Sequence, residues 1–202
     1  MPRKEGSLST ENPDGTVPRM DIEQSYEKAL RTLKRGLRPR HPWGPKEFLF
    51  LAESLKEALT SQNEKLIEQI LCLLQGTERT PEIFEDLLCR LLALSWPSSR
   101  IKIFALDTST KYIIQRRRKL SLPLPPLYLK TVGLLLENPN PELKEWALRV
   151  IDEMGKEGRP LASHILKNRP RFWQMGNKHH RHCHDIIEML MTKWGPHERV
   201  GK

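Results

Sequence analysis

The segment from Pro125 to Gly155 constrains the fold most, because it predicts two helices with a turn between them. The second helix is expected to open at Asn140-Pro141, where a capping residue precedes a proline at the first helical position. Gly155 can adopt the left-handed conformation that ends a helix. Between these ends, apolar residues recur at helical spacing opposite a charged face: Leu143, Trp146, Ala147, Val150, Ile151 and Met154. The pattern predicts a helix that buries one face and exposes the other.

The preceding helix is expected from Leu127 to Asn138, and it is apolar almost all round. Its apolar residues include Leu129, Val132, Leu134, Leu135 and Leu136. Because no side of such a helix favours contact with water, we expect neighbouring elements to cover it on more than one side.

Helical periodicity also accounts for most of the remaining chain. Prolines and glycines divide the apolar patterns into segments of helix length. Ser61 and Glu64 have the spacing of a capping box at the start of the helix predicted over residues 61–76. The predicted helices span residues 21–37, 45–59, 61–76, 80–96, 98–115, 127–138, 141–154, 160–167 and 178–194. Within the fifth of these, Ile113 and Ile114 near Thr110 disfavour a helix. No segment has the pattern of a strand, so the predicted fold class is all-α.

A chain of 202 residues can bury a substantial core within one domain, which we expect over residues 21–195. Residues 1–20 are rich in Ser, Thr, Pro, Gly and Glu and are expected to form a disordered tail, with a second disordered end over residues 196–202. The first segment contains no apolar run, so we expect neither a signal peptide nor a membrane anchor there. No later segment is apolar over about 18 residues, so we expect no membrane span.

Cys72, Cys89 and Cys183 are too few for a disulfide-stapled secreted domain. Two of the three lie in helical apolar patterns, where a reduced cysteine behaves as a small hydrophobic residue. We therefore expect an intracellular, cytoplasmic protein in a reducing compartment.

Residues 138–151 read Asn-Pro-Asn-Pro-Glu-Leu-Lys-Glu-Trp-Ala-Leu-Arg-Val-Ile, and this run resembles the second helix of HEAT and armadillo repeats. In those families a proline–acid turn leads to an apolar residue, a base and then a small residue, which here are Pro141, Leu143, Lys144 and Ala147. Residues 98–105 are a weaker version of the pattern. Trp146 stands where the families usually have a smaller residue.

The spacing of the predicted helix pairs is also similar to that of these families. Pairs begin near Pro45, Pro81 and Pro125, which are 36 and 44 residues apart, against about 40 to 47 residues per repeat. The resemblance implies an α-solenoid of about four helix pairs that binds another macromolecule in a groove and has no catalytic activity. Some HEAT-type modules of similar size place basic loops on the acidic surface of tubulin, so the resemblance also suggests a cytoskeletal or ciliary role.

The net charge of +9 is unevenly distributed along the chain. Residues 45–97 contain five Lys or Arg against nine Asp or Glu, whereas residues 98–122 contain seven against one and residues 159–202 nine against three. This distribution favours contact between the basic C-terminal half and an acidic partner.

Four consecutive bases, Arg116, Arg117, Arg118 and Lys119, end a predicted helix. Three interpretations are open: cations that stabilise the helix C-terminus, a contact for an acidic partner, or a nuclear import signal that would place the protein in the nucleus. Arg118 also lies three residues before Ser121, which is the spacing of a basophilic kinase site.

A second group combines bases with aromatic residues near the C-terminus. Its members are Arg159, Lys167, Arg169, Arg171, Phe172, Trp173, Lys178 and Arg181. Bases beside exposed aromatic rings can pair with acidic groups or phosphates and stack on planar ligands. The alternative is that Phe172 and Trp173 fill the last gap of the helical stack while the bases stay in water.

Residues 178–185 read Lys-His-His-Arg-His-Cys-His-Asp and form the one constellation that suggests a metal. His180 and His184 are one helical turn apart, as are His179 and Cys183, and such pairs can share a zinc ion. In a continuous helix, however, Cys183 falls on the apolar face and His180 and His184 face water, with no second group of ligands evident. The alternative is a polar, protonatable helix start. We expect neither a metal nor a cofactor.

No positive feature indicates an enzyme. The chain has no phosphate-binding glycine loop and no carboxylate pair on an apolar face, and Cys72 and Cys89 have no histidine nearby in sequence. We therefore predict a non-catalytic scaffold or adaptor that binds a protein with an acidic surface, with no small-molecule substrate. The alternative is a helical-repeat protein that binds nucleic acid.

Overall fold

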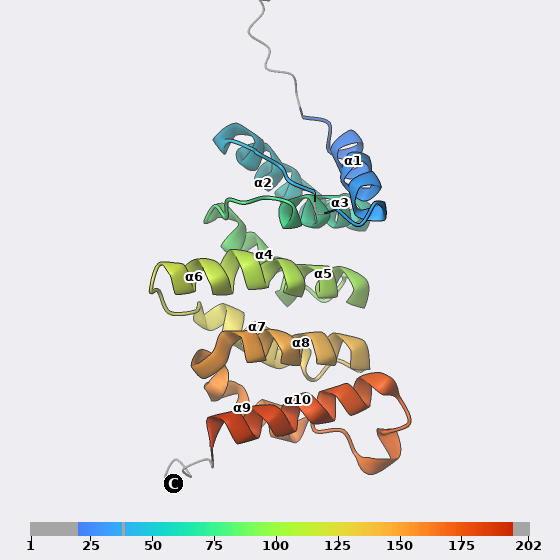
Figure 1. Ribbon diagram of the computed structural model, residues 1–202, viewed down its shortest axis with the longest axis vertical. Helices are drawn as coiled ribbons and strands as arrows, with labels where there is room; N and C mark the ends of the chain where they lie inside the picture. The colour runs from blue at the N-terminus through green and yellow to red at the C-terminus, as the bar shows by residue number, and fades with distance from the viewer. Residues whose placement is uncertain (1–19, 38, 196–202) are drawn as a thin grey trace, which may run out of the picture.

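The computed structural model describes residues 20–37 and 39–195, and every regular element in these ranges is a helix (Figure 1). The α-helices are α1 (Ile22–Lys34), α2 (Pro45–Thr60), α3 (Glu64–Gln75), α4 (Ile83–Ala93), α5 (Ser99–Ser109), α6 (Arg116–Lys119), α7 (Pro126–Leu135), α8 (Pro141–Met154), α9 (Ala162–Lys167) and α10 (Lys178–Trp194). A π-helix, η1 (Thr110–Gln115), and two 3₁₀ segments, η2 (Gly155–Leu161) and η3 (Phe172–Gln174), complete the set. The all-α prediction is confirmed. Apart from Met20, the two predicted tails lie outside the described residues.

The helices begin at the capping residues of the sequence. Asn140 accepts hydrogen bonds from the backbone N–H groups of Glu142 and Leu143 at the start of α8, as predicted, and Gly155 ends α8 with a φ of 62°. At α3 the predicted capping box is wrong. Ser61 ends α2, and Asn63 caps α3 by accepting from the N–H of Leu66 at 3.1 Å.

The helices form two layers. One layer contains α2, α4, α7 and α9, each in contact with the next, and the other contains α3, α5, α8 and α10 in the same order. Successive helices join the layers, because α2 contacts α3, α4 contacts α5, α7 contacts α8 and α9 contacts α10. Figure 1 shows these pairs stacked along the longest axis of the molecule, with α1 packed against α3 at the N-terminal end.

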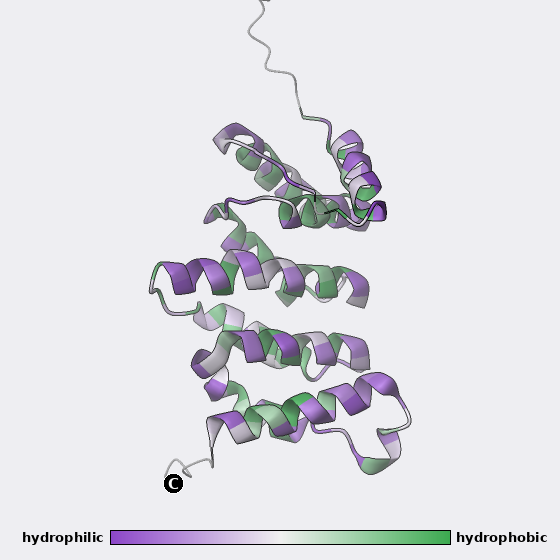
Figure 2. Ribbon diagram, in the orientation of Figure 1, coloured by the Kyte–Doolittle hydropathy of each residue, from purple (hydrophilic) through white to green (hydrophobic). Residues whose placement is uncertain are grey.

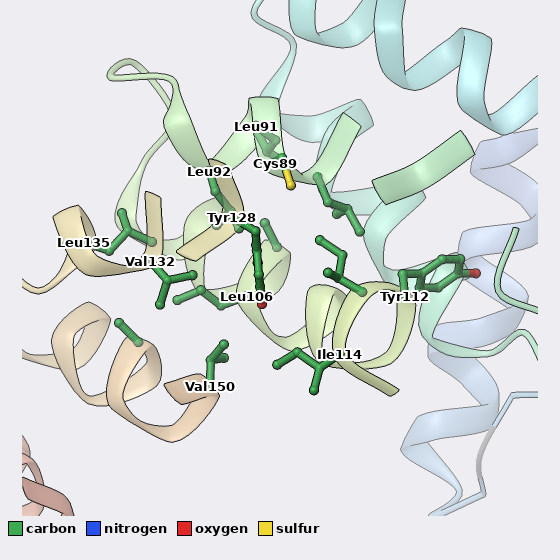
Figure 3. Close-up of a cluster of buried hydrophobic side chains, with 14 of the residues drawn as sticks. Cys89, Leu91, Leu92, Leu106, Tyr112, Ile114, Tyr128, Val132, Leu135 and Val150 are labelled. Carbon is green, nitrogen blue, oxygen red and sulfur yellow. The ribbon is translucent and has the colours of Figure 1, made fainter. Parts of the chain in front are cut away.

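The core lies between the two layers. Leu91 and Leu92 of α4, Leu106 of α5 and Val132 of α7 belong to one buried cluster together with Val150 of α8 (Figure 3). Apolar and polar residues alternate around the helices (Figure 2), as expected where each helix buries one face.

Two tyrosine hydroxyl groups are buried within this core, and both are hydrogen bonded. Tyr112 lies 2.6 Å from the hydroxyl of Thr77, and Tyr128 lies 2.6 Å from the hydroxyl of Ser109. Burial raises the pKa of both phenols. The pairs satisfy polar groups whose burial without a partner is costly.

The prediction that neighbouring elements cover the helix at residues 127–138 on more than one side is confirmed, since α7 contacts α4, α8 and α9, but one face of the helix stays uncovered. Leu127 and Leu134 are about half exposed, at 50% and 52%, and lie on this uncovered outer face. A strongly apolar sequence therefore does not mean that a helix is surrounded.

Candidate protein-interaction surface

The four-base cluster lies on α6, and half of it is engaged within the fold. The guanidinium of Arg116 pairs with Glu82 at 3.0 Å and also with Glu85, and that of Arg117 pairs with Glu85 at 2.7 Å. Glu85 belongs to α4, and its side chain is only 6% exposed. Arg117 also donates to the carbonyl of Pro123. These two arginines thus tie α6 to α4 instead of facing solvent.

The other two bases of α6 are exposed. Arg118 donates to the backbone carbonyl of Glu153, and its neighbour Lys119 lies on the surface. The separation of roles within the cluster was not evident from sequence, because Glu85 is 31 residues from Arg116. Within this cluster, Arg118 and Lys119 are therefore the two bases that are exposed enough to contact an acidic partner.

Six exposed residues of the second predicted group lie close together in sequence, and we call this set the basic–aromatic patch. It consists of Arg169, Arg171, Phe172, Trp173, Lys178 and Arg181, from the connection between α9 and α10 and the start of α10. Phe172 is 92% exposed and Trp173 is 73% exposed. The alternative in which these two rings fill a gap in the stack is therefore wrong. Of the remaining predicted bases, Arg159 and Lys167 are also exposed, and Lys167 lies 3.5 Å from Glu137.

Local contacts hold the patch in shape. Gln174 accepts a hydrogen bond from the N–H of Arg171 at 2.8 Å, which closes the short η3 turn that carries both rings. The guanidinium of Arg171 lies 5.2 Å from the ring centre of Trp173, and that of Arg169 pairs with Glu188 of α10 at 2.7 Å. The turn thus presents two adjacent aromatic rings, with the Arg171 guanidinium against that of Trp173.

The histidines of α10 have different roles from those predicted. His179 and His182 bind the buried carboxylate of Glu145 on α8, at 2.7 Å and 3.1 Å. His180 is partly buried, and its Nδ1 atom is buried without a hydrogen-bond partner in the described part of the chain, so the prediction that it faces water is wrong. Burial lowers the pKa of His180. The Nε2 atom of His184 lies 3.3 Å from Arg169.

The proposed zinc pair gains no further ligand in the described part of the chain. Within residues 20–37 and 39–195, no group of three or more His, Cys, Asp or Glu side chains could hold a metal ion. Cys183 is buried on the apolar face of α10, as predicted, and burial raises the pKa of its thiol to about 12. Burial likewise raises the pKa of Cys89 to about 11, so its thiol is protonated near neutral pH.

None of the described helices is both long enough and apolar enough to cross a membrane. Comparisons with protein-family models, with curated proteins and with solved structures find no match for this chain.

Proposed function

We propose that this chain is a non-catalytic scaffold of HEAT or armadillo type, an α-solenoid whose basic–aromatic patch binds an acidic surface of a partner protein. The observation that carries the proposal is the exposure of Phe172 and Trp173 side by side, with Arg171 against one ring. The solenoid part rests on the order of contacts, since each helix pair packs on the next along the chain.

The exposure of aromatic rings to water is unfavourable. A turn that nevertheless exposes two adjacent rings is therefore typical of a binding surface. Aromatic residues and arginine are the residues most enriched at the energetic centres of protein interfaces. In the patch the rings would supply apolar contact, while Arg171, Lys178 and Arg181 would attract and orient carboxylates. A partner with acidic and apolar groups at its surface fits this combination, and an acidic cytoskeletal surface is one example.

Nucleic acid is the second candidate, because bases can stack on exposed aromatic rings while arginine and lysine pair with phosphates. The two candidates differ in their dependence on salt. Binding to nucleic acid releases counterions and weakens steeply with salt, whereas a protein interface that relies on aromatic contacts weakens less.

The test is an affinity capture with the full chain as bait, using lysate with and without nuclease treatment. The variant F172A/W173A removes both rings, and we expect it to lose the captured partner by about tenfold or more, as for the central residues of an interface. The matched control is L37A/L49A, which truncates two other leucines that are 60% and 51% exposed.

A partner that survives nuclease, is lost by F172A/W173A and is kept by L37A/L49A supports the proposal. Partners that all disappear after nuclease treatment would favour nucleic acid instead. A partner retained equally by both variants would show that the patch is not the binding surface.

A further inference from the structure

A groove runs across three successive helices of the second layer. It has a volume of about 490 Å³ and lies between α5, α8 and α10, which Figure 1 shows stacked one beside the next. A second hollow of about 520 Å³ lies between α5 and α8. The two hollows share Asp107 and Trp146, so they form one continuous surface.

The charges that line this groove are mainly negative. Its carboxylates are Asp107 of α5, Asp152 and Glu153 of α8, and Asp185 of α10. Among the described residues, Asp152 pairs with Lys193 at 2.7 Å, and the His184 ring lies 3.7 Å from the Asp185 carboxylate. No Lys or Arg side chain of the described residues pairs with Asp107, Glu153 or Asp185. Within residues 20–37 and 39–195, the hydrogen bond that the Asp107 carboxylate accepts comes from the neutral amide of Gln75, at 2.8 Å.

The two basic side chains of the first hollow do not offset these carboxylates. Arg149 donates to Glu145 at 2.6 Å, and His182 donates to the same carboxylate at 3.1 Å. The carboxylate of Glu145 is buried and forms an ion pair with Arg149, so it neutralises the positive charge of that arginine. The groove is therefore an acidic surface on a chain whose net charge is +9.

Apolar side chains lie among the carboxylates. Trp146 and Ile186 are partly buried, and Met189 is 44% exposed. Trp146 already has the Arg149 guanidinium 5.9 Å from its ring centre. An aromatic ring flanked by carboxylates favours a cationic ligand that also carries an apolar group, because both ion pairs and cation–π contacts are then available.

We propose that this groove binds a basic peptide segment of a partner protein. Lysine or arginine side chains of the segment pair with Asp107, Glu153 and Asp185, and an apolar side chain contacts Trp146 and Met189. Charge complementarity selects the occupant, since acidic peptides and nucleic acids are repelled from the same surface. The proposal does not depend on the basic–aromatic patch, so the chain would have two binding surfaces of opposite charge.

The probe is a fluorescein-labelled peptide of sequence Gly-Lys-Arg-Leu-Lys-Arg-Leu-Lys-Gly, and its partner probe has glutamate in place of each base. Fluorescence anisotropy of each probe is measured against the full chain. We expect the basic probe to bind and E153Q/D185N to weaken it by about fivefold, as for the loss of two exposed ion pairs. The control E53Q/E57Q makes the same change in net charge at two exposed positions of α2.

A second variant tests the groove at an apolar position, so that the result does not depend on the loss of carboxylates alone. M189K places a cation at the exposed Met189 and should weaken the basic probe by about tenfold, because it adds repulsion and removes an apolar contact. Weakened binding in both groove variants with unchanged binding in E53Q/E57Q supports the proposal. No preference for the basic probe, or equal weakening by the control, overturns it. F172A/W173A is expected to bind the probe normally, which keeps this result distinct from the test of the patch.

Discussion

Glu145 is the buried charged residue on which α8 and α10 converge. Its side chain is 6% exposed and accepts hydrogen bonds from Arg149, His179 and His182. Burial raises the pKa of the Glu145 carboxyl, but these three hydrogen bonds outweigh burial and hold the pKa below its ordinary value of 4.5. The ionised carboxylate therefore stabilises the folded state above that pH.

We predict that E145Q lowers the free energy of unfolding by about 1 to 3 kcal/mol at pH 6, because it removes the charge that three donors share. The pKa is lowered on folding, so this stabilisation is present above pH 4.5 and is lost as the pH falls through the folded-state pKa. The difference between wild type and E145Q should thus shrink as the pH is lowered below 4.5. Urea denaturation at pH 6 and pH 3.5 measures it, with E57Q on the exposed face of α2 as the control. An undiminished difference at pH 3.5 would contradict this account.

Gly76 is a position where a side chain cannot be added without displacing a neighbour. A Cβ atom there would lie 2.6 Å from the His41 ring and 3.1 Å from the carbonyl oxygen of Pro39. The His41 N–H donates to the Gly76 carbonyl at 2.9 Å, and the ring of His41 stacks on Trp43 at 4.4 Å. The loop before α2 is therefore held against the end of α3 by a close approach that only glycine permits.

We predict that G76A destabilises the protein by about 1 to 3 kcal/mol, the usual effect of overpacking. The control is G176A, because a Cβ atom at Gly176 meets nothing within 4 Å. Thermal unfolding followed by circular dichroism compares the two variants, and an equal midpoint for both would refute the steric argument.

At the scale of elements, the sequence predicts the helices well because their signals are local. Capping residues and prolines mark the start of α8, and breakers of the same kind separate the other helices. The capping box at Ser61 fails because Asn63, two residues later, offers a better cap once α2 has ended. Local patterns also cannot identify contacts between distant residues. For this reason the pairing of Arg116 with Glu85, and the exposure of Phe172, follow only from the fold.

The π-helix η1 combines a local signal, which the sequence shows, with a contact between distant residues, which it does not. The β-branched residues at 113 and 114 disfavour a regular helix, and the chain stays helical there with a widened turn. Within it, Lys111 donates to the carbonyls of Leu74 and Gln75 at the end of α3, at 3.2 Å and 3.0 Å, and also to Thr77. Burial lowers the pKa of Lys111. This lysine caps a helix that lies more than 30 residues away in sequence.

We predict that K111M destabilises the protein by about 1 to 2 kcal/mol, because the carbonyl groups at the end of α3 lose a charged donor. Hydrogen exchange should show faster exchange of the amides in the last turn of α3 than in wild type. K119M is the matched control, since Lys119 is exposed at the end of α6. Unchanged exchange in α3 would mean that the lysine is not needed as a cap.

At the scale of the whole molecule, the order in which the helix pairs contact one another determines which helices a destabilising substitution should affect. Each helix pair packs mainly on the pairs next to it, from α2 and α3 at one end to α9 and α10 at the other. In a stack of this kind stability is approximately a sum of local terms and nearest-neighbour terms. A molecule whose helices all packed around one compact centre would instead lose protection everywhere when any core residue is truncated.

Two fully buried residues near opposite ends test this distinction. Leu51 of α2 has no exposed surface and Ile187 of α10 is 1% exposed, and truncation of either to alanine should cost about 2 to 5 kcal/mol locally. We predict that L51A increases hydrogen exchange mainly in α1 to α4, and that I187A does so mainly in α8 to α10. The middle pair, α4 with α5, should respond less to I187A than α8 does, because it does not contact α10 closely. Equal increases along the whole chain in both variants would refute the helical-repeat proposal, whereas opposite gradients would support it.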